Sequence, residues 1–213
     1  MSNQIVFRDF RTALSARAAK CRLSVAPTTV DALEAYFRLL AHWNKKINLT
    51  SLPLDKPTEA TVDRLFIEPL AAADRLLGSA DAWFDLGSGG GSPAIPMKVS
   101  RPGAKLSMVE SRSKKTAFLR EAVRELRLKD TDVVESRFEA LSSDGSRLNA
   151  TDIVTVRAVR PDLVLFQTAN YLLRSGGRLI IFGTAAPALA TGFDKPEQVK
   201  FPPSGSVHVF RKG

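Results

Sequence analysis

The chain has 213 residues, 44% of them hydrophobic, and a formal net charge of +9. This composition suits one globular domain with a helical extension; it excludes a largely disordered chain, and no apolar run is long enough to span a membrane. The single cysteine, Cys21, excludes a disulfide framework, and His42 and His208 stand too far apart to suggest a metal site.

The first predicted elements are helices. Residues 1–23 mix basic and acidic side chains without an apolar signal core, which suggests a basic amphipathic helix lying on the domain; the alternative is a targeting presequence. A second helix follows Thr28, which forms a capping-box-like pair with Asp31. Its apolar stripe consists of Val30, Leu33, Phe37 and Leu40.

A third helix is predicted over residues 58–77. We expect it to bend near Pro69 and to stop at Gly78. The sequence pattern changes at this point, so we expect residues 1–80 to form an N-terminal helical cap and residues 81–213 to form the main domain.

Predicted strands alternate with helices from here on. Strands are expected at 82–86, 104–110, 132–136, 152–159 and 178–183, and a last one near the C-terminus in "SVHVFRK". Helices are expected over 112–126 and from about Pro161 to Leu173, the second ending at Gly176-Gly177. This alternation predicts an α/β fold with a Rossmann-like, mainly parallel sheet and helices on both faces.

The stretch "DLGSGGGS", residues 85–92, follows the first predicted strand, where sheets of this kind bind their ligands. A P-loop is excluded because no lysine follows the glycines before Lys98. A dinucleotide fingerprint fits only weakly, with its three positions at Gly89, Gly91 and Ala94.

The turn fills the pattern D-x-G-x-G-x-G completely, with Asp85, Gly87, Gly89 and Gly91. This pattern indicates S-adenosylmethionine, because glycines let the backbone approach the adenosine without a Cβ in the way. Asp85 would accept hydrogen bonds around the cationic end of the cofactor, directly or through water. Glu110, at the end of the next strand, would accept hydrogen bonds from the ribose hydroxyls. The alternative is a tight turn that binds no ligand.

Two later strand ends add candidates. Phe138 and Glu139 follow the third strand, where a flat apolar side chain and the backbone could hold the adenine; core packing explains Phe138 equally well. Arg157 interrupts an apolar strand at its carboxyl end, over the expected cleft. A buried arginine needs an anionic or hydrogen-bonding partner, so we interpret Arg157 as a functional residue rather than a surface one.

Residues 98–129 contain ten Lys or Arg and three Glu, a net charge of +7. Such clustering favours a polyanionic partner, with nucleic acid first; the alternative is a solvated helix face. In the nucleic-acid interpretation, Arg112 and the basic residues after it meet phosphates.

Several stretches together resemble the bacterial small-subunit ribosomal RNA guanine-N7 methyltransferases, also called the glucose-inhibited division protein B family. In order, they are "HWNKKINLTSL", "FDLGSGGGSPAIPMKVSRP", "SRSKKTAFLREAVRELRL", "VVESRFEAL", "DIVTVRAV" and "GGRLIIF". The resemblance covers roughly residues 36–184. The P-x-I-P after the glycines and the serine-flanked lysine pair make it specific to this family.

The resemblance implies a class I S-adenosylmethionine-dependent methyltransferase fold with an N-terminal helical cap, acting on a guanine of ribosomal RNA. The cofactor contacts that it implies are Gly87, Ser92, Glu110, Phe138, Glu139 and Arg157. The RNA contacts that it implies are Lys114 and Lys115, with Asn44 and Asn48 in the loop near the cleft. Departures from the family pattern include Ser92 and the segment "RLFIEPLA", where a histidine and "DSL" are usual.

Guanine N7 carries a lone pair and no proton, so its methylation needs orientation rather than a general base. We therefore assign no catalytic acid or base, and expect Arg157 to position the substrate or cofactor. The expected partner is ribosomal RNA or the small ribosomal subunit. We expect the protein to act as a monomer in the cytoplasm, without membrane contact. The alternatives are a methyltransferase acting on a small molecule or protein, and a non-catalytic RNA-binding relative.

Overall fold

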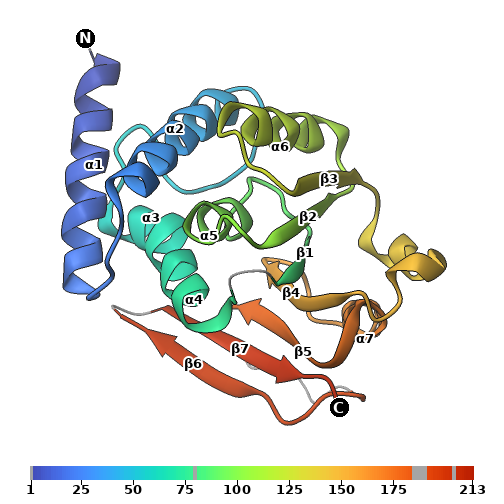
Figure 1. The fold of residues 1–213 in the computed structure, drawn as a ribbon. Coiled ribbons are helices and arrows are strands. Elements are labelled where there is room, and N and C mark those ends of the chain that lie inside the picture. Colours follow the sequence, from blue (N-terminus) through green and yellow to red (C-terminus); the bar gives the residue numbers. More distant parts are fainter. Residues whose placement is uncertain (1, 79–80, 184–190, 203–204) are drawn as a thin grey trace.

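The structure is a computed structural model that describes residues 2–78, 81–183, 191–202 and 205–213. Its centre is a seven-stranded sheet of order β3-β2-β1-β4-β5-β7-β6 (Figure 1). The strands are β1 (Ala82–Leu86), β2 (Lys105–Glu110), β3 (Thr131–Glu135), β4 (Thr151–Arg157), β5 (Leu173–Phe182), β6 (Glu197–Phe201) and β7 (Gly205–Arg211). Among the described strands, β7 runs antiparallel to both of its neighbours, β5 and β6, and the other four pairings are parallel, so the predicted mainly parallel α/β sheet is confirmed.

Helices cover both faces of the sheet. They are α1 (Ser2–Lys20), α2 (Pro27–Asn44), α3 (Glu59–Val62), α4 (Glu68–Leu76), α5 (Ala94–Ser100), α6 (Ser113–Glu125) and α7 (Leu163–Leu172). A single π-helical turn, Asp63–Ile67, joins α3 to α4 and is called the π-turn below. Within the described ranges, no helix is both long and apolar enough to cross a bilayer.

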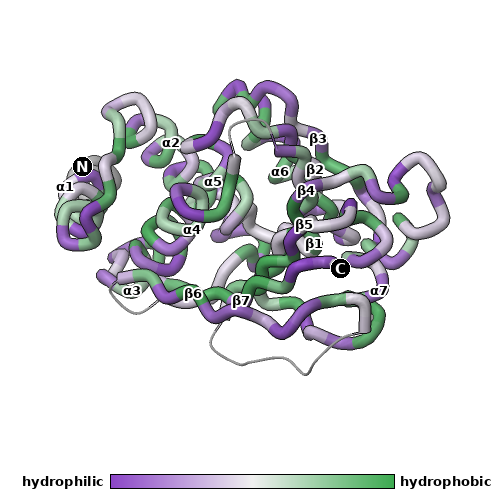
Figure 2. Tube along the Cα trace, turned by 60° about the horizontal axis from the view of Figure 1, so that its bottom comes forward, coloured by the Kyte–Doolittle hydropathy of each residue, from purple (hydrophilic) through white to green (hydrophobic). Residues whose placement is uncertain are grey.

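Successive side chains along the strands point to opposite faces of the sheet and enter two apolar cores. Trp83 of β1 belongs to the larger core, which packs against α4, α5 and α6. Leu86 of the same strand belongs to the smaller core, which packs against α7. Hydrophobic and hydrophilic positions alternate around α2 and α4, as expected of helices with one buried face (Figure 2).

The N-terminal helices pack beside the main sheet (Figure 1). Phe10 of α1 stacks on Phe37 of α2 with ring centroids 4.4 Å apart, and both side chains are fully buried. The predicted capping role of Thr28 is wrong, because α2 begins one residue earlier, at Pro27, with no side-chain cap. The predicted boundary after residue 80 falls at residues 79–80, which lie outside the described residues.

Other differences from the predicted elements have local causes. β4 ends at Arg157 rather than at residue 159, because Ala158 has φ +58° and turns the chain out of the strand. Gly176 and Gly177 lie within an irregular start of β5 instead of ending α7. The edge strand β6 was not predicted, and the helix over 58–77 is interrupted by the π-turn just before Pro69.

Candidate functional site

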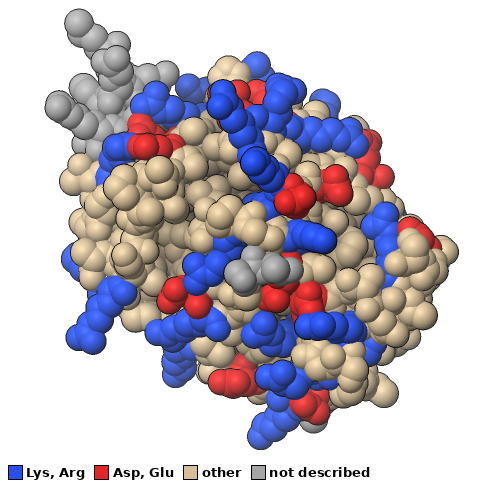
Figure 3. Space-filling model, viewed as in Figure 1, with Lys and Arg blue, Asp and Glu red and all other residues tan. Residues whose placement is uncertain are grey.

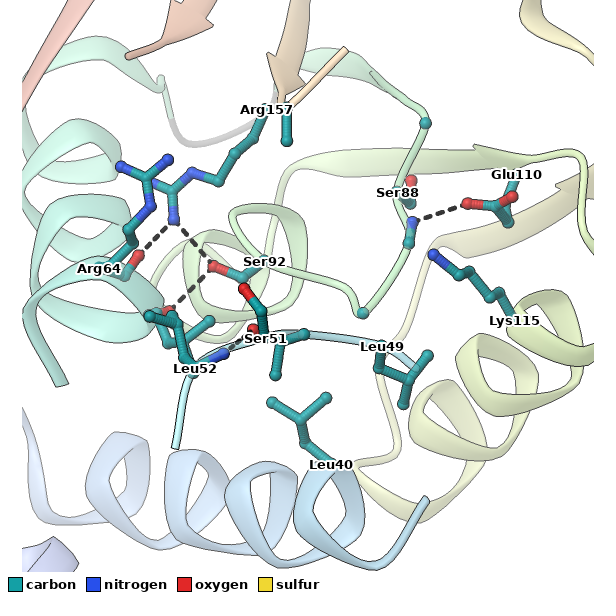
Figure 4. A pocket seen from close by; sticks show the side chains of 16 residues that line it. Leu40, Leu49, Ser51, Leu52, Arg64, Ser88, Ser92, Glu110, Lys115 and Arg157 are labelled. Atoms are coloured by element: carbon teal, nitrogen blue, oxygen red, sulfur yellow. Dashed lines mark hydrogen bonds between the residues drawn. The ribbon is translucent and has the colours of Figure 1, made fainter. Parts of the chain in front are cut away.

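A cavity of about 380 Å³ lies at the carboxyl ends of β1, β2 and β4. Its walls come from the glycine turn after β1, the loop after α2, the π-turn and the start of α6 (Figure 4). This is the edge where parallel α/β sheets bind ligands, and the volume suits a small molecule. Among the described residues, no three His, Cys, Asp or Glu side chains are grouped so that they could hold a metal ion.

Glycine occupies the positions of this turn for different structural reasons. Gly87, Gly89 and Gly91 all have positive φ, at +74°, +53° and +83°, where a side chain is strained. A Cβ on Gly87 would lie 2.6 Å from Val159, and one on Gly91 would lie 2.5 Å from Ile95. A Cβ on Gly89 would meet no atom closer than 3.7 Å, which is ordinary van der Waals contact, so no collision requires glycine at that position.

Glu110, at the end of β2, lines the cavity and is 7% exposed. Its two carboxylate oxygens accept the backbone N–H groups of Gly89 and Arg112, each at 2.9 Å. A carboxylate has about four acceptor positions, so two remain for a ligand. These free acceptor positions fit the ribose hydroxyls, which the sequence predicted as donors to Glu110.

Asp85 lies beneath the glycine turn and does not line the cavity. Its side chain is buried and accepts the Thr155 hydroxyl at 2.5 Å, and the same hydroxyl oxygen accepts the Trp83 indole N–H at 2.8 Å. Burial raises the pKa of Asp85 to about 6, although the bond from Thr155 opposes this shift. In this structure Asp85 joins β1 to β4 just before the turn, without reaching the cavity.

Arg157 lines the opposite wall of the cavity with its side chain 7% exposed. Its Nη2 pairs with the Glu68 carboxylate at 2.9 Å. Its Nη1 donates to the Ser92 hydroxyl at 3.2 Å and to the Arg64 carbonyl (Figure 4). The guanidinium carbon also lies 4.5 Å from the centre of the Phe182 ring. The partner that a buried arginine requires is thus Glu68, an acid in a largely apolar helix that the sequence analysis did not single out.

The roof of the cavity comes from residues before the sheet. Tyr36 of α2 is buried and donates its hydroxyl to the Gly90 carbonyl at 2.5 Å. Asn44 holds the loop after α2, because its side-chain oxygen accepts the N–H groups of Leu49 and Thr50 at 2.9 and 3.0 Å. Asn44 therefore shapes the roof without lining the cavity, and Asn48 is exposed outside it. Sequence reasoning missed Tyr36, which is indistinguishable from core in a helical apolar stripe.

The two candidates after β3 do not line the cavity. Phe138 is half-buried and packs against the smaller core, as the core interpretation expected, and Glu139 is exposed. Of the predicted cofactor contacts, the cavity lining brings together Gly87, Gly89, Ser92, Glu110 and Arg157.

Basic side chains gather over α6 (Figure 3). Arg112 and Lys114 are exposed at its start, and Lys115 lines the cavity beside Glu110 (Figure 4). The first turn of α6 contains no acid, although the helix dipole favours acids there, so this placement of cations is unfavourable for the helix alone. Lys98 is an exception to the predicted basic surface, because it is 1% exposed and donates to the carbonyls of Pro102 and Ala104.

Comparison with known proteins gives consistent matches. A family model described as rRNA small subunit methyltransferase G matches residues 29–189. A "Ribosomal RNA small subunit methyltransferase G" from Xanthomonas axonopodis pv. citri is 38% identical over 68% of this chain, and the match spans 64% of that relative's length. One of the same name from Neisseria meningitidis serogroup C is 36% identical over 77% of this chain and 75% of its own length.

Among solved structures, a SAM dependent methyltransferase from Aquifex aeolicus superposes with a TM-score of 0.53 and 13% sequence identity. The superposition covers 71% of this chain and 92% of that one. At this identity the likeness shows the fold alone, and it agrees with the predicted class I arrangement.

Proposed function

This chain belongs to the rRNA small subunit methyltransferase G family, which confirms the resemblance seen in its sequence, and on this premise we propose that it methylates N7 of a guanine in small-subunit ribosomal RNA. The observation that carries the proposal is one cavity flanked by the glycine turn, by Glu110 and by the basic start of α6. The first two suit a nucleoside cofactor and the third suits a phosphate backbone.

The residues that would hold S-adenosylmethionine are those that line the cavity. Glu110 would accept the ribose hydroxyls with its two remaining acceptor positions, and Gly89 would let the backbone approach the adenosine. Bound there, the cofactor would supply an electrophilic methyl group. Asp85 would act on this site indirectly, by fixing the end of β1 to β4 through Thr155 at the point where the turn begins.

The protein's part in the reaction would be to orient the base. Guanine N7 offers a lone pair without a proton, so no side chain has to remove one. The described residues that line the cavity include no cysteine or histidine, and the wall opposite Glu110 contains Arg64, Ser92 and Arg157. These groups donate hydrogen bonds and carry positive charge, which suits holding a nucleotide in place.

Arg112 and Lys114 would meet RNA phosphates next to the cavity, and Lys115 would do so from its rim. The partner would be ribosomal RNA or the small ribosomal subunit. We expect the protein to act in the cytoplasm as a monomer.

The test is methyl transfer from labelled S-adenosylmethionine to small subunits, to naked ribosomal RNA and to nucleosides or proteins as controls. Label in ribosomal RNA, mapped to a guanine N7, is the expected result. Label only in small molecules or proteins would replace the RNA substrate by the alternative class. Failure of the pure protein to bind S-adenosylmethionine in calorimetry would leave a non-catalytic RNA-binding relative.

A further inference from the structure

The π-turn leaves two backbone carbonyls without their usual helical donors. The N–H of Glu68 donates to the carbonyl of Asp63, five residues back, and not to that of Arg64. Pro69 has no N–H, so it cannot donate to the carbonyl of Arg64 or to that of Leu65. Both residues line the cavity, so the irregular turn lies at the site itself.

Side chains from the main domain satisfy these carbonyls. Arg157 Nη1 donates to the carbonyl of Arg64, and the Ser92 hydroxyl donates to that of Leu65 at 3.1 Å. Ser92 also accepts from Arg157, so the three groups form one connected network. The π-turn and Pro69 thus leave two acceptors that Arg157 and Ser92 complete.

Glu68 holds the other end of the guanidinium. It pairs with Arg157 at 2.9 Å, and its side chain is only 13% exposed. A Cβ on Gly205 would lie 2.6 Å from Glu68 Cγ, so the start of β7 packs directly against the stem of this carboxylate. The acid is therefore held rigidly, with little freedom to follow a displaced arginine.

Two arginines share this acid. Arg64 Nη1 lies 4.0 Å from the same Glu68 oxygen, and its side chain is 46% exposed. Burial, and next to it the charge of Arg64, lowers the pKa of Arg157, while Glu68 opposes both effects. Without the negative charge, two cations would face each other at the cavity wall, and one of them would be buried without compensation.

The third guanidinium nitrogen of Arg157, Nε, differs from the other two. It has no hydrogen-bond partner among the described residues. An unpaired buried donor is unfavourable for folding, so the position of Arg157 is held at a cost in stability by its other contacts.

We propose that Glu68 is a positioning residue that holds Arg157 in the reactive arrangement for methyl transfer, an inference that rests on the proposed function. Glu68 does not line the cavity and acts only through the two arginines. The π-turn before Pro69 supplies the carbonyl of Arg64 as a fixed acceptor on the other side of the guanidinium.

The test compares E68Q, E68D, R157Q and the double variant E68Q/R157Q in methyl transfer to the small subunit. E68Q keeps the size of the side chain and removes its charge, so Arg157 shifts and kcat falls by about tenfold to a hundredfold. E68D restores the charge and recovers part of this loss. Because Glu68 acts through Arg157, the double variant is no slower than R157Q.

The matched control is D74N, which neutralises another acid of α4. Asp74 pairs with Arg101 at 3.0 Å, is 65% exposed and lies outside the cavity, so kcat should change less than about twofold. All variants are assayed below their melting temperatures, with folding checked by circular dichroism. A folded E68Q with wild-type kcat and KM, or a double variant much slower than R157Q, overturns this inference alone. A wild-type protein that methylates no ribosomal RNA refutes the proposed function instead, and the inference with it.

Discussion

The carboxylate of Glu110 accepts the backbone N–H of Gly89 at 2.9 Å, so the end of β2 holds the glycine turn that follows β1. The other oxygen of the same carboxylate holds the N–H of Arg112, just before α6. One side chain therefore joins the predicted cofactor turn to the basic helix, and it still faces the cavity.

This arrangement predicts the effect of Glu110→Gln. The amide can accept only through its oxygen, so its NH₂ would face a backbone N–H, and the ribose hydroxyls would lose a charged acceptor. We expect the affinity for S-adenosylmethionine to fall by about tenfold to a hundredfold in calorimetry. Glu125→Gln, on the exposed part of α6, should leave the affinity unchanged. Equal affinities in the two variants would show that Glu110 does not bind the cofactor.

Two glycines with nearly the same φ allow the effect of backbone strain to be measured apart from that of steric overlap. Gly87 has φ +74° and Gly176 has φ +73°, but only a Cβ at Gly87 meets another atom, Val159. Gly176→Ala should reduce the free energy of unfolding by about 1 kcal/mol through backbone strain alone. Gly87→Ala should reduce it by about 2–4 kcal/mol, since overpacking adds to the strain. Urea unfolding measures both, and similar losses would mean that the turn yields to the added methyl group.

The buried acid Asp85 predicts a pH dependence. Its pKa is raised to about 6 in the folded protein from an ordinary value of 3.8, so the folded state binds its proton more tightly. The stability contributed by this group is therefore present at low pH and is lost as the pH rises from about 4 to 6. Asp85→Asn removes this loss and keeps an acceptor for Thr155. The unfolding free energy of the variant minus that of the wild type should grow by about 2–3 kcal/mol between pH 4 and pH 7. A constant difference in urea unfolding would contradict the raised pKa.

The exposed cations at the start of α6 predict a change in salt dependence. Arg112→Ala with Lys114→Ala should weaken RNA binding and flatten the plot of log affinity against log salt by about 1.5. Cofactor affinity should not change, because neither side chain lines the cavity. The control is Lys195→Ala with Lys200→Ala, two exposed lysines near and on β6. If both double variants lower RNA affinity alike, the interaction follows net charge and not this surface.

The sequence alone was sufficient to predict those features of the fold and of the site that depend on local pattern. Alternating strands and helices predicted the parallel sheet, and the spacing of the glycines with Glu110 predicted the cavity edge on which they meet. The alternation is visible within a few residues of the chain. The glycines and Glu110 meet because β1 and β2 are neighbouring strands in register. β6 escaped prediction because an edge strand with mostly exposed residues lacks the apolar alternation of a buried one.

The rest depends on contacts between distant parts of the chain. Glu68 and Arg157 are separated by 89 positions, and Tyr36 and Gly90 by 54, so no local pattern pairs them. Lys98 was counted as a surface charge because nothing near it in sequence shows that loop carbonyls surround its ammonium group. Burial of a charged group is decided by tertiary packing.

The hydrogen bond from Tyr36 to Gly90 makes ligand binding and N-terminal structure thermodynamically linked. Since α2 and its following loop form the roof of the cavity, any ligand that fills it binds only the state in which these residues are docked. Cofactor binding should therefore slow amide hydrogen exchange in α2, more than 40 positions before the glycine turn, which is the proposed cofactor contact. Docking of the N-terminal helices is then coupled to cofactor binding, and substitutions within these helices change cofactor affinity from outside the pocket.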